Sequence, residues 1–132
     1  LWITEEYLQE QPRDPQMRFW RARLLEQLKR NDEAFDTYLE LSREYPELAE
    51  VQNNLGVMLA AQGRMDEARQ AFENALRNNP DYAIAHENLG DILMHLAQRS
   101  YDKAIRLRGA DKSLKQKTTA LQPALQLTLN PP

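Results

Sequence analysis

The two histidines of the chain are the first residues to test for metal or catalytic chemistry. His86 and His95 lie nine residues apart, which on a helix is about two and a half turns, so the two rings would face different directions. Histidines that bind one metal from a helix lie four residues apart, and His86-Glu87 lacks the second histidine of a metalloprotease motif. We therefore interpret both as ordinary surface or groove histidines and predict no metal site.

Paired carboxylates occur at Asp32-Glu33 and Asp66-Glu67. Each pair comes where a helix is expected to begin, and there the negative charges complement the positive end of the helix dipole. The sequence offers no glycine-rich phosphate loop, no arrangement of Ser, His and Asp for nucleophilic catalysis, and no cysteine. We therefore predict no catalytic residues and no cofactor, and expect that the protein is not an enzyme.

Composition narrows the classes of partner. The 132 residues are enough for one domain with a modest core, and 42% are hydrophobic and 28% charged, which is typical of a globular protein. The net charge of −3 gives no electrostatic reason to expect nucleic acid or an anionic membrane surface as a partner. No apolar run approaches the roughly 20 residues of a membrane-spanning helix, so no membrane insertion is expected.

A repeat of 34 residues organises the sequence. Pro12, Pro46 and Pro80 are spaced by this period, and Asp32-Glu33-Ala34 lies over Asp66-Glu67-Ala68. A period of this size is typical of stacked units, none of which can bury its apolar face alone. Further columns with the same period hold small residues or leucine: Ala22, Gly56 and Gly90, and Leu25, Leu59 and Leu93.

Each unit reads as two short antiparallel helices. In residues 49–82 an apolar stripe with helical spacing ends at Gly63, and a second stripe from Ala68 to Leu76 ends before Pro80. Glycine inside a helix costs about 1 kcal/mol relative to alanine. We therefore expect the second helix to pack closely against Gly56.

These positions resemble the tetratricopeptide repeat, whose pattern is Trp-x-x-Leu-Gly-x-x-Tyr, then Ala-x-x-x-Phe, then Pro. Residues 49–82 match best, with Leu55-Gly56, Ala68, Phe72 and Pro80 in place. Residues 15–48 match less fully, and residues 83–116 keep Leu89-Gly90 but then depart from the pattern. The resemblance implies an all-α fold of tandem helix–turn–helix repeats, stacked as a short right-handed α-solenoid.

On this basis we expect one repeat domain over residues 1–121. Residues 1–14 would be the second helix of a truncated repeat, which implies that the chain is the back portion of a longer array. Complete repeats are expected at 15–48 and 49–82, and a degenerate repeat with a C-terminal cap helix at 83–121. The remaining segment, 122–132, is expected to be an extended or weakly ordered tail.

The third unit departs from the pattern after Gly90. No glycine or proline interrupts residues 91–108, and one apolar stripe continues throughout, so we predict a single long helix that ends at Gly109. The alternative is an ordinary helical pair with a longer turn around residues 98–100. A cap helix is predicted from about Lys112 to Leu121, stopping before Pro123.

In the tetratricopeptide family the first helix of each unit lines a concave surface, and the resemblance therefore implies a ligand-binding groove here. Asn54 and Asn88 recur with the repeat, and an Asn side chain can bond both N–H and C=O groups of an extended peptide. Alternatively, these Asn residues cap or bridge helices. Trp20 either stacks on a ligand or packs under the first helix. The predicted groove residues are Phe19, Trp20, Arg23, Asn53, Asn54, Val57, Glu87, Asn88, Asp91 and Met94.

The implied function is a scaffold that binds a partner protein or peptide in this groove. The acidic residues Glu50, Glu87 and Asp91 argue against the carboxylate clamp that chaperone-binding members of the family use. Two alternatives remain open: a self-associating assembly module that forms a homo-oligomer, and an accessory domain of a larger protein. Similarity to bacterial stand-alone repeat proteins, some of which are exported, indicates the periplasm or cell envelope, with the cytoplasm as the alternative.

Overall fold

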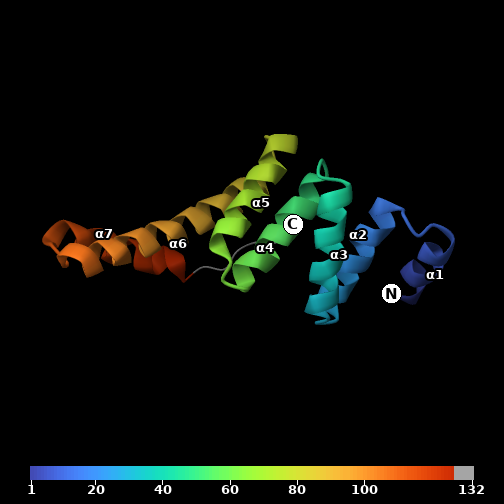
Figure 1. The fold of residues 1–132 in the computed structure, drawn as a ribbon, viewed down its shortest axis with the longest axis horizontal. Helices are drawn as coiled ribbons and strands as arrows, with labels where there is room; N and C mark the ends of the chain where they lie inside the picture. The colour runs from blue at the N-terminus through green and yellow to red at the C-terminus, as the bar shows by residue number, and fades with distance from the viewer. Residues whose placement is uncertain (127–132) are drawn as a thin grey trace.

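In the computed structural model, which describes residues 1–126, that part of the chain consists of helices and turns without a strand. Each helix packs against the next in chain order, which confirms the predicted all-α helical repeat solenoid (Figure 1). Residues 127–132 of the predicted tail lie outside the described residues. The helices are α1 Trp2–Glu10, α2 Pro15–Gln27, α3 Asn31–Glu44, α4 Ala49–Ala61, α5 Met65–Asn78, α6 Ala83–Arg108 and α7 Lys112–Leu125.

Local sequence signals explain where the helices begin. Asp14 caps α2, because its side chain accepts hydrogen bonds from the backbone N–H groups of Gln16 and Met17 at 3.0 and 3.4 Å. Pro15 follows at the first helical position, where a missing N–H costs nothing. The first turns of α3 and α5 carry the acidic pairs expected there.

The turn between the two helices of a unit depends on one backbone position. Lys29 and Gly63 follow α2 and α4 and adopt positive φ angles of 62° and 79°. The residue with the same place in the third unit is Ala97, which lies inside α6. At Ala97 the chain continues as a helix and so avoids the left-handed conformation, which costs an L-residue such as Lys29 about 1–2 kcal/mol. The predicted long helix is confirmed, since α6 runs unbroken to Arg108 and is followed by Gly109.

The C-terminal cap helix runs further than we predicted. α7 begins at Lys112 as expected, but it continues through Pro123 to Leu125, so the predicted end at Leu121 is wrong and the first four residues of the predicted tail are helical. Proline has no backbone N–H, so the carbonyl of the residue four positions earlier loses its helical hydrogen bond. That residue, Thr119, is exposed, so water can bond its carbonyl and the helix continues for two more residues.

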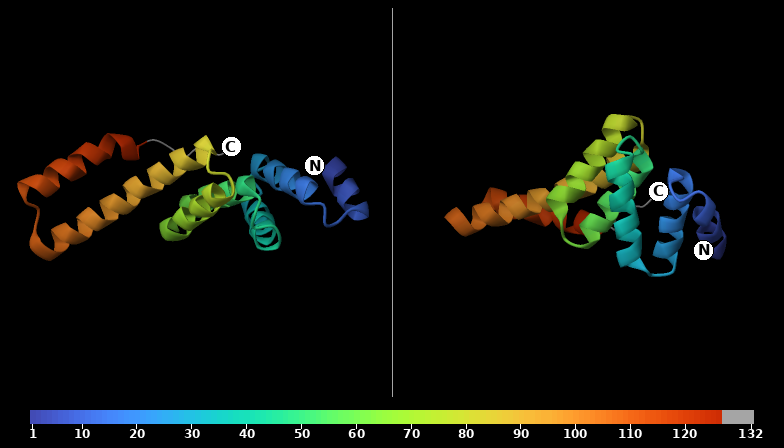
Figure 2. Two further views of the ribbon diagram at one scale, coloured as in Figure 1. Left: turned by 90° about the horizontal axis from the view of Figure 1, so that it is seen from above. Right: turned by 45° about the vertical axis from the view of Figure 1, so that its right-hand side comes forward.

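The core lies between the paired helices of the two complete repeats. Tyr38 of α3 and Phe72 of α5 are completely buried, as are the small residues Ala22 and Ala68, which the repeat places at close helix contacts. Beyond this core, α6 and α7 form an antiparallel hairpin that extends away from the stacked helices (Figure 2). The N-terminal half of α6 packs on α5, and its C-terminal half packs on α7.

Candidate functional site

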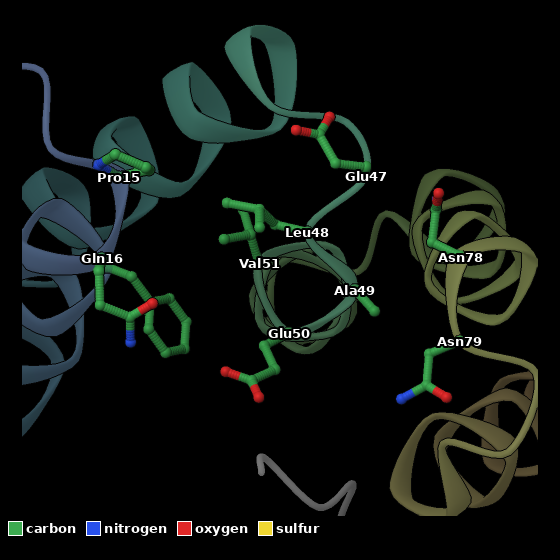
Figure 3. A pocket seen from close by; sticks show the side chains of 10 residues that line it. Pro15, Gln16, Glu47, Leu48, Ala49, Glu50, Val51, Asn78 and Asn79 are labelled. Atoms are coloured by element: carbon green, nitrogen blue, oxygen red, sulfur yellow. The ribbon is translucent and has the colours of Figure 1, made fainter.

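Two surface pockets lie along the boundary between the first helices of the two complete repeats. At one end lies a pocket of 420 Å³ that is lined by Gln16 and Phe19 of α2 and by Glu50 and Val51 of α4. Gln16 and Glu50 lie on opposite sides of it (Figure 3). At the other end a pocket of 380 Å³ lies between Glu26 of α2 and residues of α4. We call the strip that joins these two pockets, together with the adjoining side of α6, the groove. The α4 residues of the second pocket are Val57, Met58, Ala61 and Gln62.

An exposed aromatic ring and a cation occupy the α2 side of the groove. Trp20 is 44% exposed, and the guanidinium of Arg23 lies over its ring, 5.3 Å from the centroid. Phe19 lies behind Trp20 with the ring centroids 6.0 Å apart, but it is almost fully buried and belongs to the core. A fixed, half-exposed tryptophan is a side chain suited to stacking on an aromatic, aliphatic or peptide group of a partner.

The α6 side of the groove is acidic. Glu87 and Asp91 lie four residues apart on α6, so they are neighbours on one helix face. Burial and the neighbouring Glu87 charge raise the pKa of Asp91, while His95 opposes this shift. Because a nearby cation would relieve both causes of the shift, this wall is suited to a Lys or Arg side chain. Met94 is half-buried next to it and offers apolar surface.

Three predicted groove residues are instead buried between helices. Asn88 donates from Nδ2 to Oδ1 of Asn53 at 3.0 Å, which joins α6 to α4. Asn54 donates to the hydroxyl of Tyr38 at 3.1 Å, and that hydroxyl donates to Glu26. All three asparagines are at most 3% exposed. These contacts match the alternative interpretation, in which the asparagines bridge helices. In this structure the three side chains have almost no surface that a ligand could contact.

Tyr82, which we did not identify from the sequence, lies near two charged residues of this region, Glu50 and Arg23. Its hydroxyl is buried and finds no hydrogen-bond partner among the described residues. Burial and the charge of Glu50 raise the pKa of Tyr82, and Arg23 lowers it, so all three residues share one environment beside the larger pocket. A ligand or a water molecule could supply the hydrogen bond that this hydroxyl lacks. The sequence clue to Tyr82 was its place in the repeat, because it shares a repeat column with Leu48, which lines that pocket.

The family comparison agrees with this architecture. A family model described as tetratricopeptide repeat matches residues 4–49, 37–73 and 54–107. The chain belongs to the tetratricopeptide repeat family. None of the curated proteins compared with the sequence matches it. Tetratricopeptide repeats generally mediate protein–protein interactions, and the fold is typically a non-catalytic scaffold.

Residues 1–126 contain no group of three or more His, Cys, Asp or Glu side chains placed to hold a metal ion. Within that range, too, no helix combines the length and apolar character needed to cross a membrane. Of the ten predicted groove residues, six have accessible surface in the structure: Trp20, Arg23, Val57, Glu87, Asp91 and Met94.

Proposed function

We propose that this tetratricopeptide protein is a scaffold that binds an extended segment of a partner protein in the groove, and that the segment carries a basic side chain. Two observations carry the proposal: α2 has an exposed aromatic residue, and α6 has a pair of acidic residues on one face. Trp20 provides the stacking surface, and Glu87 and Asp91 provide the acceptor for a cation. Val57 and Met94 supply apolar contact between them.

The chemistry of the groove favours a peptide over a compact small molecule. The two end pockets are open, and they are separated by the length of the strip between α2 and α4. An extended chain could span both pockets and present alternate side chains to each. At the larger pocket, Glu47 and Glu50 add negative charge, so a second basic residue of the same segment would be favoured there.

The test uses defined peptides on an array. Extended peptides that differ only in the number and position of Lys and Arg are incubated with the labelled protein. We expect peptides with a basic residue next to an apolar or aromatic residue to bind most tightly, and raised salt to weaken this preference. Asp91→Asn should reduce the preference for basic peptides. Asp36→Asn, at an exposed position of α3 outside both pockets, is the matched control and should leave it unchanged.

Trp20 has a matched control in the only other tryptophan, Trp2, which is 71% exposed on α1. Trp20→Ala should weaken peptide binding by about 1–3 kcal/mol, because buried aromatic anchors dominate such interfaces. Trp2→Ala should not. Peptide binding without any preference for basic residues, or equal effects of the two tryptophan variants, would contradict the proposed site.

A further inference from the structure

The charges of the chain are divided between the stacked helices and the α6–α7 hairpin. Residues 98–132 carry 7 Lys and Arg against 2 Asp and Glu, a net charge of +5. Residues 1–97 carry the remaining 10 Lys and Arg against 18 Asp and Glu, a net charge of −8. The overall net charge of −3 hides this division, so it does not exclude an anionic partner for the hairpin.

Most cations of the hairpin keep their charge unneutralised. Arg99 bonds Asp66 of α5, and Arg108 pairs with Asp111 at 3.4 Å. Lys117 lies over the ring of Tyr101. The other four cations are exposed and form no ion pair with any residue of the described range 1–126: Lys103, Arg106, Lys112 and Lys115.

Helix stability does not explain why these cations gather at the tip of the hairpin. Lys112 and Lys115 lie in the first turn of α7, where the positive end of the helix dipole repels them. Asp111 already caps this helix, because its carboxylate accepts a hydrogen bond from the N–H of Leu114 at 2.8 Å. The lysines and the dipole therefore add to one positive field, together with Arg106 in the last turn of α6.

An exposed apolar side chain lies in the middle of this charge. Leu107 is 75% exposed, and it lies between Arg106 and Arg108 just before the turn at Gly109. A lipid bilayer with anionic headgroups offers both things that this tip lacks, since an apolar layer lies directly beneath the negative charge. A nucleic acid is matched less well. The hairpin's one aromatic residue, Tyr101, is half-buried under Lys117, so in residues 98–126 no ring is open for base stacking.

The length of the hairpin separates its tip from the acidic part of the molecule (Figure 2). Between residues 98 and 108 α6 rises by about 15 Å, at about 1.5 Å per residue. This length exceeds the Debye length of about 8 Å at physiological ionic strength. An anionic surface at the tip would therefore be largely screened from the charge of −8 on residues 1–97. A projecting tip can also reach a flat, extended surface without a clash of the stacked helices.

We propose that the tip of the α6–α7 hairpin docks on an anionic lipid bilayer. Leu107 lies at the boundary between headgroups and acyl chains, and Arg106, Lys112 and Lys115 lie among the headgroup phosphates. The contact is peripheral and needs no helix that crosses the membrane. The groove lies on α2, α4 and the N-terminal half of α6, away from this tip, so the proposal stands or falls separately from the proposed function.

The first test measures cosedimentation of the protein with vesicles. Vesicles of equal parts phosphatidylglycerol and phosphatidylcholine should bind it, vesicles of phosphatidylcholine alone should not, and raised salt should release it. Each basic residue near an anionic surface contributes a factor of about five, so Arg106→Gln combined with Lys112→Gln should weaken binding about 30-fold. Arg43→Gln combined with Arg77→Gln makes the same change of charge at exposed positions of α3 and α5. This matched control should bind as the wild type does.

The second test asks whether the tip enters the bilayer or only meets its charge. Leu107→Ala leaves the charge unchanged and should weaken vesicle binding about tenfold, because it removes methyl groups that the acyl layer would bury. The chain has no cysteine, so a polarity-sensitive dye can be attached at Ala110→Cys alone. Its emission should shift to shorter wavelength on anionic vesicles. The same dye at Gln9→Cys, an exposed position of α1, should not respond. Circular dichroism checks that every variant is folded.

Three results would overturn the proposal. The first is binding to the anionic vesicles that is absent, or that is equal on phosphatidylcholine alone. The second is a folded Leu107→Ala variant with unchanged vesicle binding while polyglutamate or a DNA duplex binds the wild type more tightly than the vesicles do, which would make the tip a site for a polyanion. The third is a dye response at Gln9→Cys without one at Ala110→Cys, which would place the contact on α1.

Discussion

The side chain of Asn54 donates a hydrogen bond to the hydroxyl of Tyr38 across the boundary between the two complete repeats, at 3.1 Å. Tyr38 is fully buried, and its hydroxyl in turn donates to Glu26 on the first helix of its own repeat. One tyrosine thus ties three helices together directly beneath the groove. Buried polar contacts of this kind fix how consecutive repeats are placed, because any shift leaves a polar atom unpaired.

Tyr38→Phe should therefore destabilise the protein by about 1–3 kcal/mol at neutral pH, since it leaves the Asn54 amide without an acceptor. Urea denaturation followed by circular dichroism measures this. The closest available comparison is Tyr45→Phe, at a half-buried tyrosine whose hydroxyl donates only a long bond of 3.4 Å to a backbone carbonyl. Equal midpoints for the two variants would contradict the importance of the buried bond.

The same tyrosine should make the fold sensitive to alkali. Burial, and then the bond to Glu26, raise the pKa of Tyr38 well above its ordinary value near 10. A group with a raised pKa in the folded state contributes stability that is fully present below its ordinary pKa and is lost as the pH rises above it. We expect the free energy of unfolding to fall between about pH 9 and pH 11, and Tyr38→Phe to reduce that slope. If the free energy of unfolding depended on pH equally in Tyr38→Phe and in the wild type, Tyr38 would not be the cause of the alkaline sensitivity.

Two glycines of the same repeat column should respond to alanine in opposite directions. Gly56→Ala would place a methyl group against the Phe72 ring, and we expect a net loss of about 1–2 kcal/mol from overpacking, partly offset by the better helix propensity. Gly90→Ala meets open space and should stabilise by about 0.5–1 kcal/mol. Changes of the same sign would contradict the packing contrast.

The ion pair between Arg99 of α6 and Asp66 of α5 should make the stability of the protein depend on pH in the acid range. The two terminal guanidinium nitrogens of Arg99 on α6, Nη1 and Nη2, donate hydrogen bonds to the carboxylate of Asp66 at the start of α5, at 2.9 and 3.0 Å. Arg99 lowers the pKa of Asp66. The ion pair therefore stabilises the folded protein at pH values above the ordinary carboxylate pKa near 4. This stabilisation is lost as the pH falls through the lower pKa that Asp66 has in the folded protein. Asp66→Asn should flatten the loss of stability below about pH 4, as urea midpoints at several pH values would show, whereas Asp36→Asn should not.

The repeat architecture could be predicted because it depends on local sequence signals. The period of 34 residues fixed the pairing of helices, and the absence of glycine or proline after Gly90 was enough to predict the long helix. The backbone angles of Lys29 and Gly63 show where the other two units turn, and Ala97, at the same place in the third unit, keeps the helical conformation instead. The end of α7 could not be predicted, because the solvent exposure of Thr119, which makes Pro123 tolerable, is a tertiary property.

The site was less predictable than the fold. Repeat register indicated that Asn54 and Asn88 belong to first helices, but not that Tyr38 and Asn53 would reach them from neighbouring elements. Whether an asparagine meets solvent or another helix depends on the length of the side chains opposite it, which differs between repeats. Trp20 shares the column with Asn54 and Asn88 and yet remains exposed, since its bulky ring cannot enter the space that an asparagine fills.

The two tryptophans allow the most direct measurement of whether the groove binds a basic peptide segment. Each indole N–H gives a separate resonance in a ¹H–¹⁵N spectrum, one from Trp20 in the groove and one from Trp2 on α1. The spectrum is followed while the tightest basic peptide from the array is added. We predict that the Trp20 indole resonance shifts saturably together with the backbone amides of Asp91 and Met94, while the Trp2 resonance stays in place. A shift of Trp2 with Trp20 unmoved, or a bound peptide that moves neither, would contradict the account.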